Sequence, residues 1–174
     1  YAYSPNKVEA YLGKSCQKFT KADIIKYIVD NNIHMVNFLY PAGDGRLKTL
    51  NFVINSIEYL DTILSCGERV DGSSLFSFIG AGKSDLYVVP RFKTAFLDPF
   101  AELPTLSLLC TYFDKDGMPF AATPIQTLQR ACQAFHESTG LEFQCMGELE
   151  YYVIAPDEGT FPATDQKGYH ESAP

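Results

Sequence analysis

The stretch TKADIIKYIVDNNIHMVNFLYPAGDGRLKTLNFVINSIEYLDTILSCG, residues 20–67, decides the fold. Its apolar residues recur at helical spacing, then alternate at the two-residue spacing of strands, and then return to helical spacing. The stretch therefore predicts a helix, a hairpin of two strands and a second helix, in that order. Together with further strands downstream, this order is typical of a compact α+β domain.

Both helices have recognisable ends. Thr20 is a favourable N-cap, and Asp23 three residues later adds the second half of a capping box. Ser56 caps the second helix, and Gly67 closes it. The apolar faces consist of Ile24, Ile25 and Ile28 in the first helix and of Ile57, Leu60, Ile63 and Leu64 in the second.

The segment between these helices is predicted to be a hairpin. Residues His34–Tyr40 alternate, Gly43–Gly45 supply the turn, and Lys48–Ile54 form the returning strand. Two more strands are expected over Asp85–Pro90 and Thr105–Phe113, with a connection between them that two prolines interrupt.

The pattern changes behind the turn Asp114–Gly117. Thr123 and Pro124 begin another helix, which stops before Gly140. Its apolar stripe is Ile125, Leu128, Cys132 and Phe135. The run Phe143–Ala155 then has the composition of one long strand.

Composition and charge exclude several functional classes. Of 174 residues, 46% are hydrophobic, and 14 Lys and Arg against 21 Asp and Glu give a net charge of −7. An acidic chain repels a phosphate backbone, so no nucleic-acid partner is expected. No apolar run reaches the ~18–20 residues that cross a bilayer, so no membrane partner is expected. The five cysteines are odd in number and lack a CxxC pair, which favours buried free thiols in a reducing cytoplasm.

Glu148 and Glu150 form the clearest candidate for chemistry. Side chains two apart on a strand share a face, so both carboxylates would point the same way. Mg²⁺ and Mn²⁺ prefer oxygen ligands, and this face could present two of them. The same spacing also fits a solvated strand face, and spacing alone leaves both interpretations open. Met146, Tyr152 and Ile154 share the face and make it partly apolar, so carboxylates there need a cation or a donor.

Other chemical motifs are weak. The glycine-rich run Gly80–Asp85 lacks the earlier glycine of a phosphate loop, because Ser77 stands in its place. No nucleophile elbow surrounds Ser73 or Ser74. The three histidines have no spacing that suits a metal site or a catalytic triad.

Six short segments carry more information in combination. They are Asp71-Gly72-Ser73-Ser74; Ser84-Asp85; Thr94-Ala95 with Asp98-Pro99-Phe100; Pro104-Thr105-Leu106; GELEYYVIA from Gly147; and Lys167-Gly168-Tyr169. In this order and with this spacing they resemble the N-terminal region of glutamine synthetases over roughly residues 20–169. The resemblance implies a β-grasp-like N-terminal domain over residues 1–113 and, over 114–174, the first helix and strand of an α/β catalytic domain.

The resemblance also implies roles for individual residues. Glu148 and Glu150 would be ligands for the two divalent ions, Mg²⁺ or Mn²⁺, that bind glutamate and ATP phosphate. Asp71 would bind ammonium and accept its proton, with Asp85 nearby and with Ser74 and Tyr169 in the same pocket. In the family, the loop at Asp71 completes the active site of a neighbouring subunit, so a homo-oligomer is expected.

The implied reaction is the ATP-dependent synthesis of glutamine from glutamate and ammonium, a step of nitrogen metabolism. Phosphate is transferred to the glutamate side chain, and ammonia then displaces it. The remaining ligands would lie beyond Pro174, so the chain alone is predicted to be inactive. Two alternative functions stay open. The protein could be a γ-glutamyl ligase that acts on a polyamine or another amine, or a non-catalytic oligomerisation or regulatory module.

Overall fold

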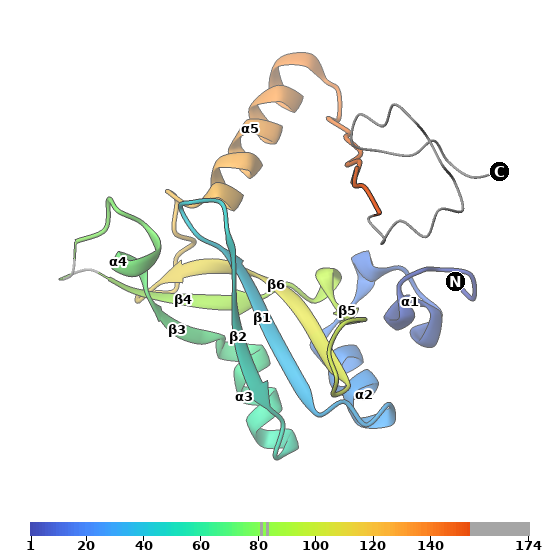
Figure 1. Cartoon of the computed structure of the whole chain (residues 1–174). Helices are drawn as coiled ribbons and strands as arrows, with labels where there is room; N and C mark the ends of the chain where they lie inside the picture. Colours follow the sequence, from blue (N-terminus) through green and yellow to red (C-terminus); the bar gives the residue numbers. More distant parts are fainter. Residues whose placement is uncertain (81, 83, 154–174) are drawn as a thin grey trace, which may run out of the picture.

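A computed structural model of the chain describes residues 1–80, 82 and 84–153 (Figure 1). The helices are α1 (Lys7–Leu12), η1 (Cys16–Lys18), α2 (Lys21–Asp30), α3 (Ile57–Cys66), α4 (Gly72–Leu75), η3 (Phe92–Thr94) and α5 (Pro124–Thr139). The strands are β1 (Met35–Pro41), β2 (Leu47–Val53), β3 (Glu68–Asp71), β4 (Asp85–Pro90), β5 (Phe96–Leu97) and β6 (Thr105–Asp114). The predicted helix–hairpin–helix order and the α+β class are both confirmed.

The sheet is mixed and has the strand order β2-β1-β6-β4-β3. The hairpin partners β1 and β2 are antiparallel, whereas β1 and β6 run parallel. The second half of β6 pairs with β4, and β4 pairs with β3, both antiparallel. Strand β5 lies outside this path and pairs with the first half of β6. The ten residues of β6 therefore join both halves of the sheet.

The core lies between this sheet and helices α2 and α3. Fully buried side chains from both layers meet there, and they include Ile24, Leu60 and Leu64 from the helices and Val36, Phe38, Leu106 and Leu108 from the strands. Burying one such side chain contributes about 1.5–3 kcal/mol. The apolar stripes predicted for the two helices therefore supply the helical side of the core, although Ile57 at the start of α3 remains exposed.

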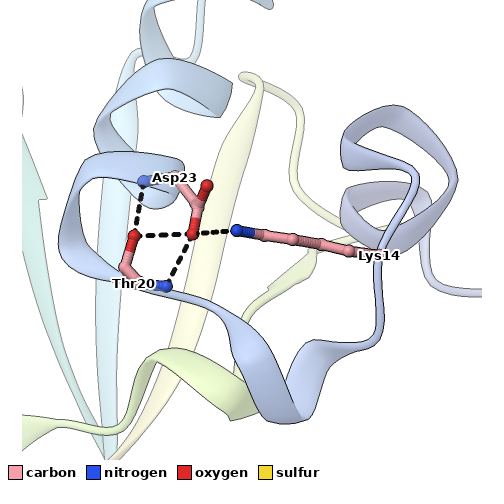
Figure 2. A network of polar contacts seen from close by, with 3 residues as sticks. All are labelled: Lys14, Thr20 and Asp23. Atoms are coloured by element: carbon pink, nitrogen blue, oxygen red, sulfur yellow. Dashed lines mark hydrogen bonds and ion pairs between the residues drawn. The ribbon is translucent and has the colours of Figure 1, made fainter.

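The start of α2 shows how local sequence fixes an element (Figure 2). Asp23 N donates to Thr20 Oγ1 at 3.3 Å, and Thr20 N donates to Asp23 Oδ2 at 2.8 Å, which completes the capping box. Lys14 Nζ reaches the same carboxylate at 2.5 Å. Burial disfavours the charged form of Asp23, but the hydrogen bonds from Lys14 and Thr20 outweigh it and lower the pKa of this carboxyl group.

Helix α5 has the predicted start and end but a different environment. Thr123 Oγ1 caps it, and Gly140 ends it in the left-handed conformation. None of its residues is buried, and Leu128 is 63% exposed. The helix extends away from the sheet (Figure 1), and Phe135 of its apolar stripe packs edge-on against Phe143 in the segment that follows the helix.

Two predictions need correction. Residues 143–153 form irregular, exposed backbone rather than a strand; Ile154 and Ala155 lie outside the described residues. A strand needs a neighbour for its N–H and C=O groups, and no described strand pairs with this segment. The five cysteines are free as predicted, but only Cys110 is buried, while Cys16 is half-buried and Cys66, Cys132 and Cys145 are exposed.

Candidate functional site

Asp71 and Asp85 lie directly opposite each other at one end of the sheet. Asp71 is the last residue of β3, Asp85 is the first of β4, and the antiparallel register pairs them. Side chains at such positions have Cβ atoms about 4.5–5.5 Å apart. The family resemblance alone predicted that Asp85 lies near Asp71, and the structure brings the two together by strand pairing.

The Asp71 carboxylate caps the short helix α4. Its Oδ1 accepts hydrogen bonds from the Ser73 hydroxyl at 2.7 Å and from Ser73 N at 3.0 Å. These two bonds, in that order of strength, lower the pKa of the Asp71 carboxyl group. The Ser74 hydroxyl turns back to donate to the carbonyl oxygen of Asp71 at 2.8 Å. Both serines therefore shape the turn that presents the ionised carboxylate.

Gly72 is closely packed at this turn. A Cβ at this position would lie 2.9 Å from Leu86 Cδ1 and 3.0 Å from Ile79 Cδ1. Its N–H donates to the carbonyl oxygen of Ser84 at 2.6 Å, which holds the turn against the start of β4. Each residue of the Asp-Gly-Ser-Ser sequence thus takes part in a hydrogen bond that holds the turn together.

Asp85 has a charged partner that the sequence analysis did not identify. Arg69 Nη1 donates to Asp85 Oδ1 at 3.0 Å, and both side chains are more than half exposed. Arg69 lies two residues before Asp71 in β3, and hence on the same face of the strand. The four-residue segment between Gly67 and Gly72 is too short to be recognised as a strand from its sequence. The common face of Arg69 and Asp71 was therefore not predicted.

A groove of about 410 Å³ opens beside Asp85. It is lined by Gly82, Ser84, Asp85, Leu86, Asp114, Lys115, Asp116 and Phe120. Of the eight lining residues that the structure describes, three are acidic, and the cation of Lys115 is bound to Asp116 at 2.9 Å. The end of the sheet that carries the Asp71–Asp85 pair is therefore mainly negative, which favours small cations.

The turn that carries Asp71 is anchored in the core behind it. Phe76 is 2% exposed and packs edge-on against the ring of Tyr112, with 5.3 Å between the ring centroids. Gly43 N, from the β1–β2 turn, donates to the carbonyl oxygen of Leu75 at 2.9 Å. Contacts with β6 and with the β1–β2 turn therefore hold the segment that carries the exposed Asp71 carboxylate in place.

Glu148 and Glu150 lie far along the chain from this pair. Both belong to the exposed irregular segment after α5, so the expected common strand face is not present. Carboxylates are suitable donors for Mg²⁺ or Mn²⁺, but Mg²⁺ takes six ligands, and the described residues contain no group of three His, Cys, Asp or Glu that could hold a metal ion. Tyr169 lies outside the described residues.

The described part of the chain also contains no helix that is both long and apolar enough to cross a membrane.

Comparison with known proteins gives the fold a family context. Residues 32–115 match the family model described as the β-grasp domain of glutamine synthetase. A glutamine synthetase of Methanococcus maripaludis is 27% identical over 157 residues, which cover 86% of this chain and 35% of the relative. A 3-hydroxylaminophenol mutase of Cupriavidus pinatubonensis is 33% identical over 137 residues, covering 78% of this chain and 27% of the relative. The chain thus spans about a third of the length of these curated relatives.

A solved structure has the same fold. The electron cryomicroscopy structure of Plasmodium falciparum glutamine synthetase superposes with a TM-score of 0.60 at 20% identity, over 72% of this chain and 24% of that one. The resemblance noted in the sequence is confirmed for the N-terminal portion of the chain, as is the β-grasp fold.

Proposed function

We propose, from the premise that residues 32–115 carry the β-grasp domain of glutamine synthetases, that this chain is the N-terminal part of an ATP-dependent ligase that joins ammonium to the side-chain carboxylate of glutamate. The observation that carries the proposal is the cross-strand pairing of Asp71 with Asp85. It places two carboxylates at the exposed end of the very domain that the comparisons identify.

The chemistry of ammonium suits this pair. Ammonium must lose a proton before its nitrogen becomes a nucleophile, and a carboxylate both attracts the cation and accepts that proton. Asp71 is the better candidate of the two for binding the cation, because Asp85 is paired with Arg69, whereas no cation among the described residues contacts Asp71. Ser74 fixes the turn, and we assign Tyr169 to the same pocket from its place in the sequence.

Glu148 and Glu150 are the proposed metal ligands. Mg²⁺ or Mn²⁺ bound there would screen the charge of the phosphate that ATP transfers to glutamate. Two carboxylates are an incomplete ligand set, so we assign the remaining ligands, the ATP site and the glutamate site to sequence beyond residue 174. The 174-residue chain is then inactive alone, and residues 1–113 and 114–174 are the N-terminal domain and the start of the catalytic domain.

Oligomerisation is part of the proposal. Asp71 and Asp85 are exposed at one end of the sheet, whereas Glu148 and Glu150 follow α5, which extends away from it (Figure 1). A site that needs all four residues is completed most directly when one subunit supplies the acid pair and its neighbour supplies the glutamates. We therefore propose a homo-oligomer with active sites between subunits.

The test starts with the reading frame that encodes the chain. We expect several hundred further codons after Pro174, and the full-length protein is expected to form glutamine from glutamate, ammonium and ATP in the presence of Mg²⁺ or Mn²⁺. The 174-residue chain serves as the matched control and is expected to form none. A stop codon near Pro174, or a full-length protein without ammonium-dependent ATP hydrolysis, would contradict the proposal.

The two alternatives predict other results in the same assay. A γ-glutamyl ligase for larger amines would turn over a diamine faster than ammonium. A non-catalytic module would form oligomers but hydrolyse no ATP with any amine. The acid pair favours ammonium, because Arg69 already neutralises one of its two carboxylates and the remaining single charge suits a compact monovalent cation.

A further inference from the structure

Arg69, Asp71 and Asp85 form one charge set on two paired strands. Asp71 stands opposite Asp85 in the register, and Arg69 lies two residues before Asp71 on the same face of β3. Like charges directly opposite each other on neighbouring strands repel. Two ionised carboxylates in this position are therefore stable only if each has donors of its own.

The donors are of different kinds. Asp71 accepts hydrogen bonds from neutral groups, which are the hydroxyl and the N–H of Ser73 and also the side chain of Ser84 and the N–H of Ser74. Asp85 accepts from the guanidinium of Arg69, which is charged at every physiological pH. The charge of Asp85 is thus compensated by a cation, whereas no cation among the residues that the structure describes contacts Asp71.

The other charges at this end of the sheet leave that division intact. Asp114, Lys115 and Asp116 come from the end of β6 and the turn after it, and they line the groove beside Asp85. Lys115 is bound to Asp116, and Asp114 Oδ1 accepts from the backbone N–H groups of Asp116 and Met118. Among the described residues, Arg69 is the cation that contacts Asp85.

We propose that Arg69 is a positioning residue: its guanidinium occupies Asp85, so that a small monovalent cation binds at Asp71, which no cation of the described residues contacts. The inference rests on the proposed function, in which this cation is the substrate ammonium. Guanidinium and ammonium compete for Asp85. Removing Arg69 therefore gives the incoming cation two open carboxylates, and its affinity rises.

The experiment is a double-mutant cycle in the full-length protein, with KM for ammonium, KM for ATP and kcat measured at one pH and one ionic strength. Arg69→Gln is expected to lower KM for ammonium roughly two- to five-fold, the size typical of an exposed ion pair, and to leave KM for ATP unchanged. Arg69→Lys keeps the charge and is expected to stay within about two-fold of the unmodified protein.

The Asp85→Asn background tests the route of the effect. Without Asp85 the exposed guanidinium of Arg69 has lost its carboxylate partner, so Arg69→Gln is expected to change KM for ammonium by a smaller factor there than in the unmodified protein. Lys21→Gln removes another exposed ion pair, that with Asp61 between α2 and α3, and is the control expected to leave KM for ammonium unchanged.

The outcomes separate two failures. An active protein in which Arg69→Gln leaves KM for ammonium unchanged, or changes it equally with and without Asp85, overturns the role of Arg69 and leaves the proposed function standing. If Arg69→Gln lowers kcat and thermal stability but leaves the ratio of KM for ammonium to KM for ATP unchanged, Arg69 has a structural role, and the proposal is overturned as well. Absence of ammonium-dependent synthesis in the unmodified protein overturns the proposed function, and the role of Arg69 with it.

Discussion

The hydroxyl of Tyr112 donates a hydrogen bond to the carbonyl oxygen of Pro41 at 2.8 Å. Tyr112 lies in β6 and is fully buried, and Pro41 ends β1 at the hairpin turn. The same ring packs against Phe76, the residue that follows α4. One side chain therefore ties the hairpin turn to the segment that presents Asp71.

We expect Tyr112→Phe to destabilise the protein by about 1–3 kcal/mol, because it leaves the carbonyl oxygen of Pro41 without this donor. Urea unfolding of the 174-residue chain measures the loss. Tyr40→Phe is the matched control, since the hydroxyl of Tyr40 makes no hydrogen bond to any residue that the structure describes; its cost should stay below about 0.5 kcal/mol. Equal losses in both variants would contradict the role assigned to the Tyr112 bond.

Gly67 is expected to be intolerant of alanine. It ends α3 with φ 70° and ψ −159°, a region that only glycine adopts readily, and an added Cβ would lie 2.3 Å from the carbonyl oxygen of Val88. We expect Gly67→Ala to cost more than about 3 kcal/mol or to prevent folding. Gly13 has φ 65° but open space around its Cβ position, so Gly13→Ala should cost only about 1–2 kcal/mol. Thermal unfolding of both variants makes the comparison, and equal melting temperatures would rule out the Val88 contact as the cause.

Stability should depend on pH through Asp23. Its folded-state pKa is lowered by Lys14 and Thr20, so its contribution is complete above the unfolded-state pKa of about 3.9 and is lost as pH falls through the folded value. Asp23→Asn is expected to cost about 1 kcal/mol at pH 7 and progressively less below pH 4. Urea midpoints at pH 7 and pH 3 test this, and a cost that does not change between the two pH values would exclude ionisation of Asp23 as the source.

Asp71→Asn should impair the use of ammonium selectively. The amide keeps an oxygen that can accept from Ser73, so the turn is retained, but it carries no charge and cannot take a proton. In the full-length protein we expect a loss of about 100-fold or more in kcat/KM for ammonium, the size typical of general-base removal, with ATP affinity unchanged. Parallel losses for ammonium and ATP would point to misfolding of the turn.

Glu148→Gln and Glu150→Gln test the metal assignment. Each replacement removes one charged oxygen ligand, so we expect weaker Mn²⁺ binding to the full-length protein and loss of synthesis that added metal partly restores. Glu142→Gln is a suitable control, because this exposed carboxylate lies in the same irregular segment and contacts His136. Unchanged metal affinity in both variants would remove these residues from the site.

The local signals in the sequence were sufficient for the elements they flank. Thr20, Ser56 and Thr123 each cap the predicted helix, because a side-chain oxygen three residues before an N–H satisfies it without help from the rest of the fold. Asp71 and Ser74 were identified from a short ordered pattern, and the turn they form is equally local. Strand β3 was missed, because four residues give too little alternation to recognise.

Long-range pairing was beyond the sequence. Nothing in residues 143–153 distinguishes a strand from the exposed segment observed, since a strand exists only where a neighbour supplies its hydrogen bonds. The apolar stripe of α5 was predicted correctly from periodicity, but what packs against it is not encoded in that periodicity.

By itself, then, the sequence determined the capped helices and the hairpin, because each depends on residues within a few positions of one another; the α+β class followed from the order of these elements, and the candidate acids from the order of six short segments. Only the tertiary structure decided that β6 lies parallel to β1, which aligns Asn37 with Asn51 and Ser107 in a hydrogen-bonded row across three strands. It alone set Asp71 opposite Asp85 and Arg69 against that pair. Register joins residues distant in the chain through backbone hydrogen bonds, and those bonds are the same for every side chain.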